Sequence, residues 1–188
     1  MIVIKFGGTS VADSTAISRT IEIIRKKLTE RPIVVVSALS KVTDLLYKIS
    51  DKARERDKCG AYELMAQLRT RHLTLAEELI NTDSCNASEQ DCASMLEDAK
   101  GRINTICDRL EHFVDAVCEL GELSDRSKAV IIGNGEYLSS NVICLAMNAR
   151  GIRTHLMDSR RRIITDNVFL KGEPRTELTT EKVNAEVH

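Results

Sequence analysis

Short β-branched runs and a run of helical periodicity alternate in the N-terminal part of the sequence. Residues 2–6 form an apolar segment that Gly7 and Gly8 close. A series of apolar residues from Ile17 to Leu28 recurs at spacings of four, three and four, which places it on one face of a helix. Residues 33–36 are continuously β-branched, as in a strand buried on both faces. This order predicts a parallel βαβ unit with a right-handed crossover.

Two longer segments carry apolar residues at heptad spacing. Two mostly apolar series recur at alternating steps of three and four residues, and a polar stretch from Asn81 to Gln90 separates them. The series are Met65, Leu68, His72, Leu75 and Leu79, and then Cys92, Leu96, Ala99, Ile103, Ile106, Leu110, Phe113 and Val117. Two such seams joined by a short link predict an antiparallel helical hairpin at about residues 61–118. A coiled-coil surface for a partner protein is the alternative interpretation of the same seams.

The α/β pattern resumes after the predicted hairpin. Residues 129–132 are predicted as a third strand, leading to a helix that ends at Gly151. Residues 153–158 and 163–165 are predicted as a fourth strand and a short edge strand. A last helix is predicted over residues 178–187, which makes the whole an α/β chain with a mostly parallel sheet.

Charge and composition narrow the class of protein. The chain of 188 residues has 27 Lys and Arg against 28 Asp and Glu, for a net charge of -1. Proteins that bind nucleic acid rely on a basic surface, and 3% aromatic residues leave few rings on which bases could stack. One globular domain without a nucleic-acid partner is therefore predicted.

Neither a membrane segment nor a metal site is predicted. No apolar stretch approaches the roughly 20 residues that span a bilayer, and Lys5 interrupts the N-terminal apolar run too early for a secretory signal. The six cysteines show no CxxC motif and no Cys/His ligand spacing. We expect a cytoplasmic protein with free, largely buried thiols, and a structural disulfide is the alternative.

The first group of candidate site residues lies where the first predicted strand ends. Lys5 brings a positive charge there, and Gly7 and Gly8 allow a ligand to approach the backbone closely. The unpaired N–H groups at the start of the following helix attract anions, and its possible N-cap residues are Thr9, Ser10, Asp13 and Ser14. An ordinary tight turn with the Lys5 ammonium in solvent is the alternative.

A second group follows the other predicted strands. Glu136 comes just after the predicted strand at 129–132, and Ser37 and Thr43 flank the turn after the second strand. A carboxylate at a helix start is stabilised by about 0.3–1 kcal/mol, so a purely structural Glu136 is the alternative. Because parallel sheets bind ligands at the carboxyl ends of their strands, we expect these residues to share one face with Lys5. Such a face suits a small zwitterionic ligand beside a phosphate.

Several stretches together resemble the motifs of one enzyme family. They are Val-Ile-Lys-Phe-Gly-Gly-Thr-Ser-Val-Ala at 3–12, Val-Val-Ser-Ala-Leu-Ser-Lys-Val-Thr-Asp-Leu-Leu at 35–46, Gly-Glu-Leu-Ser at 121–124, and Gly-Glu-Tyr-Leu-Ser-Ser at 135–140. In this order, and over nearly the whole chain, they resemble aspartokinases. The tail at 158–174, with Asp-Ser-Arg, Thr-Asp-Asn and Glu-Pro, resembles the lysine-sensitive branch most closely.

The resemblance implies the amino-acid kinase fold, an α/β/α sandwich with a lobe for the amino acid and a lobe for ATP. It implies transfer of the γ-phosphoryl group of ATP to the β-carboxylate of L-aspartate, with Mg²⁺. It also implies the site residues: Lys5 stabilises the transferring phosphoryl group, Glu136 receives the substrate ammonium, Ser37 and Thr43 contact the substrate, and Gly7, Gly8 and Ser10 lie against the phosphates.

The chain departs from the family after these motifs. It has no segment like the family's "TTLGRGGSD", which supplies an arginine for the substrate carboxylate and an aspartate that orients the lysine. Residues 1–188 are thus expected to be the aspartate-binding lobe, including the hairpin, without the nucleotide lobe or ACT domains. We expect this isolated chain to be inactive and to self-associate, as a homo-oligomer, through an exposed sheet edge or through the missing downstream domains.

Two other functions stay open on the sequence alone. A related kinase could act on another small amino acid or acid, such as glutamate, acetylglutamate or carbamate. A protein without catalytic activity could instead use the predicted hairpin as an interaction module.

Overall fold

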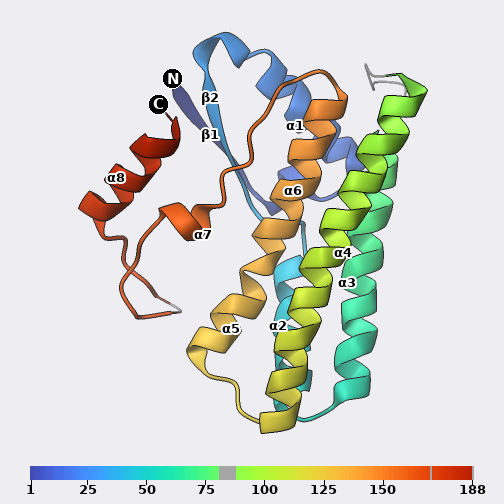
Figure 1. Cartoon of the computed structure of the whole chain (residues 1–188), viewed down its shortest axis with the longest axis vertical. Coiled ribbons are helices and arrows are strands. Elements are labelled where there is room, and N and C mark those ends of the chain that lie inside the picture. Colours follow the sequence, from blue (N-terminus) through green and yellow to red (C-terminus); the bar gives the residue numbers. More distant parts are fainter. Residues whose placement is uncertain (81–87, 170, 188) are drawn as a thin grey trace.

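The computed structural model of the chain describes residues 1–80, 88–169 and 171–187 (Figure 1). Of the polar link predicted from Asn81 to Gln90, residues 81–87 lie outside the described residues, and Cys85 lies there with them. The described part consists of a small parallel sheet, a bundle of long helices beside it, and a C-terminal arm of two helices.

A parallel pair of strands begins the chain. Strand β1 (Ile2–Phe6) pairs with strand β2 (Pro32–Val36) in a register that runs from Ile2 opposite Pro32 to Phe6 opposite Val36. The 3₁₀ turn η1 (Gly8–Val11), helix α1 (Ser14–Arg25) and the 3₁₀ turn η2 (Leu28–Glu30) connect them. The predicted βαβ unit is confirmed.

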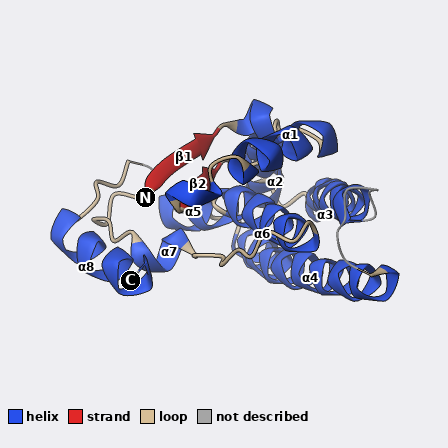
Figure 2. Ribbon diagram, turned by 90° about the horizontal axis from the view of Figure 1, so that it is seen from above, coloured by secondary structure: helices blue, strands red, loops and turns tan. Residues whose placement is uncertain are grey.

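The two faces of this sheet have different surroundings. Along β1 the side chains of Ile4 and Phe6 belong to the core or pack against it, whereas Val3 and Lys5 are exposed. Lys5 lies opposite Val35, which is 43% exposed. Figure 2 shows the sheet at the margin of the molecule, with the long helices gathered to one side of it. The exposed face and the edges of the sheet therefore lie outside the hydrophobic core.

The predicted helical hairpin is present as helices α3 (Lys58–Ile80) and α4 (Glu89–Leu120), which lie along each other (Figure 1). Helices α2 (Val42–Arg54) and α6 (Asn134–Ala149) also pack against this pair. The seams are buried in the chain's own core, and their buried members include Met65, Leu68, Leu75, Leu79, Leu96, Ala99, Ile103, Ile106, Leu110 and Val117.

The predicted seam is wrong at one position of α4. Phe113 is 50% exposed, and its neighbour Val114 is buried instead. Residues three and four positions after Leu110 both lie on its side of the helix, so spacing did not distinguish Phe113 from Val114.

The third predicted strand is wrong. Residues 129–132 form the end of helix α5 (Asp125–Ile132), which begins at the N-cap residue Ser124. The Ser124 hydroxyl accepts a hydrogen bond from the Ser127 N–H at 3.1 Å. A run of only four apolar residues is compatible with a strand or a buried helix, and here the cap upstream of it favours the helix. Helix α6 follows directly after Gly133.

The fourth predicted strand and the edge strand are also wrong. In the segment 153–158 the Thr154 N–H donates to Asn148 Oδ1 at 2.9 Å and its hydroxyl donates to the Cys144 carbonyl at 3.1 Å. These bonds attach the segment to α6 rather than to a strand. Of residues 163–165, only Thr165 forms a β-bridge, an isolated antiparallel one with Pro174.

The C-terminal arm consists of helix α7 (Ser159–Arg162), which the sequence patterns did not predict, and helix α8 (Thr176–Val187). Helix α8 confirms the last predicted helix. Glu186 on α8 accepts a hydrogen bond at 2.9 Å from His155 Nε2 and forms an ion pair with Arg162 of α7. Polar contacts thus join α8 to α7 and to the segment before α7.

Four of the described cysteines, Cys59, Cys107, Cys118 and Cys144, are free thiols. The prediction that the cysteines are largely buried holds for Cys107 and Cys118, whereas Cys59 is exposed and Cys92 and Cys144 are half-buried. No helix in the described part of the chain is long and apolar enough to cross a bilayer.

Candidate functional site

Three segments that are distant in sequence meet around Ala38, whose side chain is only 2% exposed. A Cβ atom on Gly8, in the loop after β1, would lie 3.2 Å from the Ala38 carbonyl oxygen. A Cβ atom on Gly135, in the first turn of α6, would lie 3.0 Å from the Ala38 Cβ. The loops after both strands and the start of α6 therefore approach one another more closely than larger residues would allow.

Gly7 and Gly8, both predicted to let a ligand approach the backbone, have different surroundings. Gly8 permits close packing between two protein segments, whereas a Cβ on Gly7 would have no atom within 4 Å. Gly7 is exposed and extended, with φ -80° and ψ 173°. Gly7 is therefore the position at which a ligand could approach this backbone.

Of the possible N-cap residues, Asp13 and not Ser10 caps the helix that follows the glycines. The Ser10 N–H donates to the Gly7 carbonyl at 2.9 Å within the 3₁₀ turn η1. Helix α1 begins only at Ser14, because Asp13 is its N-cap and accepts a hydrogen bond from the Ala16 N–H at 2.8 Å. An anion beside Gly7 would thus meet the amides of a short turn rather than the N-terminus of α1.

Lys5 lies in β1 on the exposed face of the sheet, one residue before the strand ends. Within residues 1–80, 88–169 and 171–187 its ammonium group has no ion pair or hydrogen bond. This placement is compatible with a contact to a phosphoryl group and equally with a lysine in solvent.

Ser37 and Thr43 lie at the two ends of the turn after β2. The Ser37 N–H donates to the Phe6 carbonyl at 3.1 Å, so Ser37 continues the pairing of the strands. Thr43 is half-buried in the first turn of α2, just after Lys41, which has φ +64° in the left-handed region. Both residues are therefore near the carboxyl ends of the strands, as predicted.

A helix, and not the predicted strand, positions Glu136. It does not follow a strand: it is exposed in the first turn of α6, immediately after α5. Two strand ends and a helix start, rather than three strand ends, surround the site. A hydrogen bond of 2.8 Å from the Ser139 hydroxyl to the Ser37 carbonyl nevertheless connects this part of α6 to the turn after β2.

A cation beside this turn of α6 was not among the predicted site residues. The Arg160 guanidinium stacks over the Tyr137 ring at 3.7 Å from its centroid. Asp158 holds it with two hydrogen bonds of 2.9 and 2.8 Å, and these bonds lower the pKa of Asp158 below its usual value. Asp158-Ser159-Arg160 is one of the stretches that resemble the family, but spacing gives no sign that Arg160 lies against Tyr137, the residue after Glu136.

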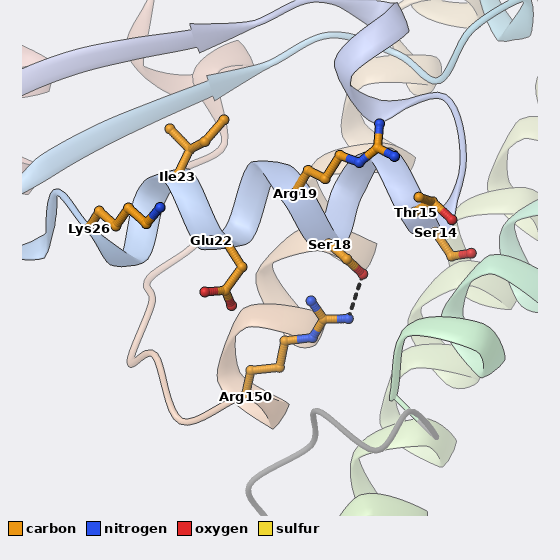
Figure 3. A pocket seen from close by; sticks show the side chains of 8 residues that line it. All are labelled: Ser14, Thr15, Ser18, Arg19, Glu22, Ile23, Lys26 and Arg150. Carbon is orange, nitrogen blue, oxygen red and sulfur yellow. Dashed lines mark hydrogen bonds between the residues drawn. The ribbon is translucent and has the colours of Figure 1, made fainter.

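Two hollows of the surface contain none of the predicted site residues. The larger, of about 720 Å³, runs along α1 and is lined by Ser14, Thr15, Ser18, Arg19, Glu22, Ile23, Lys26 and Arg150. Figure 3 shows Arg150 reaching from the end of α6 to Ser18, to which its Nη2 donates at 2.9 Å. The smaller, of about 300 Å³, is lined by Lys41, Asp44, Leu45, Lys48, Gln67 and Arg71, next to Thr43 in sequence.

The described residues do not form a metal-binding cluster. Within the described ranges, no group of three or more His, Cys, Asp or Glu side chains is close enough to hold an ion. Magnesium in nucleotide enzymes is bound by one or two carboxylates together with substrate phosphates. Such a site needs fewer carboxylates than a cluster of three, so binding of Mg²⁺ stays part of what the resemblance implies.

Sequence comparison identifies relatives along most of the chain. The profile of the amino acid kinase family matches residues 1–187. The aspartokinase of Chlamydia muridarum is 35% identical over 174 residues, which cover 92% of this chain and 33% of that protein. The chloroplastic bifunctional aspartokinase/homoserine dehydrogenase 2 of Arabidopsis thaliana is 33% identical over 162 residues, 86% of this chain and 16% of that protein. The chain thus spans a third or less of these two relatives.

Solved structures agree with the sequence comparison. The T-state structure of E. coli aspartokinase III in complex with lysine and aspartate aligns with all of this chain and 38% of that chain, with a TM-score of 0.79 at 20% identity. Clostridium acetobutylicum aspartate kinase aligns with a TM-score of 0.60 at 24% identity, over all of this chain and 36% of that chain. The predicted fold is confirmed, and the chain is homologous to aspartokinases over part of their length. Together with the profile match, this shows that the chain belongs to the amino acid kinase family.

Proposed function

We propose that the chain is the aspartate-binding part of an aspartate kinase, whose complete polypeptide transfers the γ-phosphoryl group of ATP to the β-carboxylate of L-aspartate. The observation that carries the proposal is the meeting of three motif segments around Ala38. The motifs at 3–12, 35–46 and 135–140 are far apart in sequence, yet Gly8 and Gly135 both approach Ala38 of the middle motif closely.

The chemistry of this reaction fits the residues that the site offers. A β-carboxylate is already ionised near neutral pH, so it needs no general base. Catalysis of phosphoryl transfer then rests on positioning and on stabilising negative charge. In this proposal Lys5 stabilises the transferring group, and the backbone at Gly7, Gly8 and Ser10 lies against the phosphates.

The amino acid is bound by the other side of the site in this proposal. Glu136 accepts a charge-assisted hydrogen bond from the aspartate ammonium, and Ser37 and Thr43 contact the substrate. Glu136 is exposed and in the first turn of α6, so its carboxylate is accessible to a ligand.

ATP is the proposed phosphoryl donor, with Mg²⁺. A solved structure of E. coli aspartokinase III contains aspartate and ADP and aligns with the whole of this chain with a TM-score of 0.80, which supports nucleotide use. The segments that would bind the nucleotide are proposed to lie in a further lobe, because the described chain corresponds to 37% of that structure.

The branch, compartment and assembly of the enzyme belong to the proposal as well. The tail motifs at 158–174 support the lysine-sensitive branch. The free thiols support a cytoplasmic location. The open face and edges of the sheet, where Val3 is 69% exposed, support self-association or cover by a further domain.

One of the alternative functions has lost its support. The heptad seams suggested the interaction module, and these seams are buried inside the chain between α3, α4 and their neighbours. The other alternative, a kinase that phosphorylates a different small amino acid or acid, is tested by comparing acceptors in the assay below.

A hydroxamate assay for acyl phosphate tests the proposal. The complete polypeptide, with ATP and Mg²⁺, is expected to turn over aspartate, and not glutamate, acetylglutamate or carbamate. The isolated 188-residue chain is expected to be inactive in the same assay. Positioning of ATP against the acceptor supplies most of the acceleration, and the proposed nucleotide-binding lobe is needed for it. Turnover of a different acceptor by the complete polypeptide would identify another member of the family.

A further inference from the structure

A single buried hydroxyl connects the two halves of the proposed amino-acid site. Ser139 on α6 is 0% exposed. Its hydroxyl donates to the Ser37 carbonyl at 2.8 Å, and the Glu136 carbonyl is 3.1 Å from the same oxygen. A hydroxyl has one hydrogen to donate, and the shorter contact is the bond to Ser37. This bond links residues 102 positions apart in sequence.

The packing around this bond leaves little room for α6 to move closer. A Cβ on Gly135 would lie 3.0 Å from Ala38 Cβ, 3.1 Å from Leu46 Cδ1 and 3.3 Å from Val42 Cγ1. Gly135 and Ser139 are four residues apart and thus on the same face of the helix. Steric contact at Gly135 and the hydrogen bond at Ser139 together fix this face of α6 against the turn after β2 and the start of α2.

The same face determines where Glu136 lies relative to the rest of the site. Glu136 is between Gly135 and Ser139 in the chain, and Thr43 is next to Val42, which contacts the Gly135 position. No strand precedes Glu136 to fix its position, because α5 leads directly into α6. The position of the Glu136 carboxylate therefore depends on how α6 packs against residues 37–46.

We infer that Ser139 is a positioning residue for amino-acid binding: its bond to the Ser37 carbonyl holds Glu136 at the distance from Ser37 and Thr43 that the substrate requires. This inference rests on the proposed function, in which Glu136 binds the aspartate ammonium. Ser139 itself is fully buried, so it acts through Glu136 and does not touch the substrate. Binding groups displaced by as little as about 1 Å lose much of their effect.

The chain contains a matched control for this residue. Ser140, the next residue on α6, donates its hydroxyl to the Tyr137 carbonyl at 3.0 Å, a local bond within the helix. Ser139→Ala removes a serine hydroxyl together with the link to Ser37, and Ser140→Ala removes a serine hydroxyl without that link.

The test is steady-state kinetics of the complete polypeptide carrying each variant. Ser139→Ala is expected to raise the KM for aspartate about three- to tenfold, the effect of losing one buried hydrogen bond. Its KM for ATP is expected to stay within twofold of wild type, and kcat to fall less than the KM rises. Ser140→Ala is expected to leave all three constants at their wild-type values.

Calorimetric titration with aspartate provides a second readout that does not depend on turnover, and the affinity is expected to fall by the same factor. If Ser139→Ala does not fold, Ser139→Cys keeps the shape and a weak donor, and is expected to show a smaller rise confined to aspartate.

The outcomes distinguish a failure of this inference from a failure of the proposed function. If the wild-type polypeptide turns over aspartate and Ser139→Ala has an unchanged KM for aspartate, this inference alone is overturned. Equal losses for aspartate and ATP, or equal effects of the Ser139 and Ser140 variants, would also overturn it and indicate a purely structural hydroxyl. A wild-type polypeptide without aspartate-dependent turnover would overturn the proposed function and this inference together.

Discussion

The helical hairpin and the two-stranded sheet differ in how much of each lies inside the protein. Helices α3 and α4 bury apolar side chains along most of their length, whereas β1 and β2 have an exposed face that carries Val3, Lys5 and Val35. The candidate site residues lie on or near the sheet and not in the hairpin. The comparison suggests that the hairpin contributes stability and that the sheet and its loops contribute chemistry.

This division has a physical basis. The free energy gained by burying apolar surface depends on the buried area and not on where in the fold that area lies. A binding site needs accessible charges and backbone groups, which a packed core excludes. Substitutions in the two regions should therefore affect different measurements.

The largest expected effect is on folding, from Leu110→Ala in the hairpin. Leu110 is completely buried in α4, so the variant should lose about 2–5 kcal/mol of unfolding free energy through lost burial and a cavity. Urea titration of the 188-residue chain measures it. Leu120→Ala, in the same helix but 71% exposed, is the matched control and should change little. Equal losses would show that the hairpin is not the stabilising region.

The next effect is on catalysis, from Lys5→Met in the complete polypeptide. Loss of one electrostatic contact to the transition state typically lowers kcat about 10²–10³-fold, and the KM for aspartate should change little. Thermal unfolding should be unaffected, because Lys5 is exposed. Lys26→Met, an exposed lysine just after α1, should retain normal kcat. A near-normal kcat in Lys5→Met would leave Lys5 as a solvent-exposed side chain.

A third prediction concerns pH and the hairpin. Burial lowers the pKa of His72 from 6.5 to about 4, and the nearby Arg71 charge acts in the same direction. The Nδ1–H group donates to the Leu68 carbonyl at 2.8 Å, and among the described residues Nε2 has no partner. Between pH 6.5 and 4 the unfolded chain therefore binds more protons on His72 than the folded chain.

The sign of the effect follows from this difference. The contribution of His72 to stability is fully present above pH 6.5 and is lost as the pH falls to about 4. The loss amounts to about 3 kcal/mol. Unfolding free energies measured at several pH values should show this slope, and His72→Leu should flatten it. An unchanged slope in the variant would assign the pH dependence to other groups.

The smallest of these effects is expected from Glu136→Gln in the complete polypeptide. Loss of a charge-assisted bond to the substrate ammonium should weaken aspartate binding by about 1.5–3 kcal/mol and leave ATP binding unchanged. Calorimetric titration with each ligand measures this. Normal aspartate affinity with a small loss of stability would instead assign Glu136 to the helix dipole.

Local patterns in the sequence determined several features of this protein. The β-branched runs and the helical series between them predicted the βαβ unit, and long heptad seams predicted α3 and α4, because many residues repeat one period. The motifs containing Lys5, Gly7, Gly8 and Glu136 indicated the kinase family through their residue types and their order along the chain. The roles of these residues stay predictions.

Only the tertiary structure decided the features that depend on non-local partners. Residues 129–132 and 153–158 are too short to carry a period, and their conformation depended on a helix cap at Ser124 and on hydrogen bonds from Thr154 to α6. The approach of α6 to the turn after β2 depended on the absence of a side chain at Gly135 and on the bond from Ser139 to Ser37. The sequence alone does not show which backbone groups find a partner, because those partners lie up to 125 residues away.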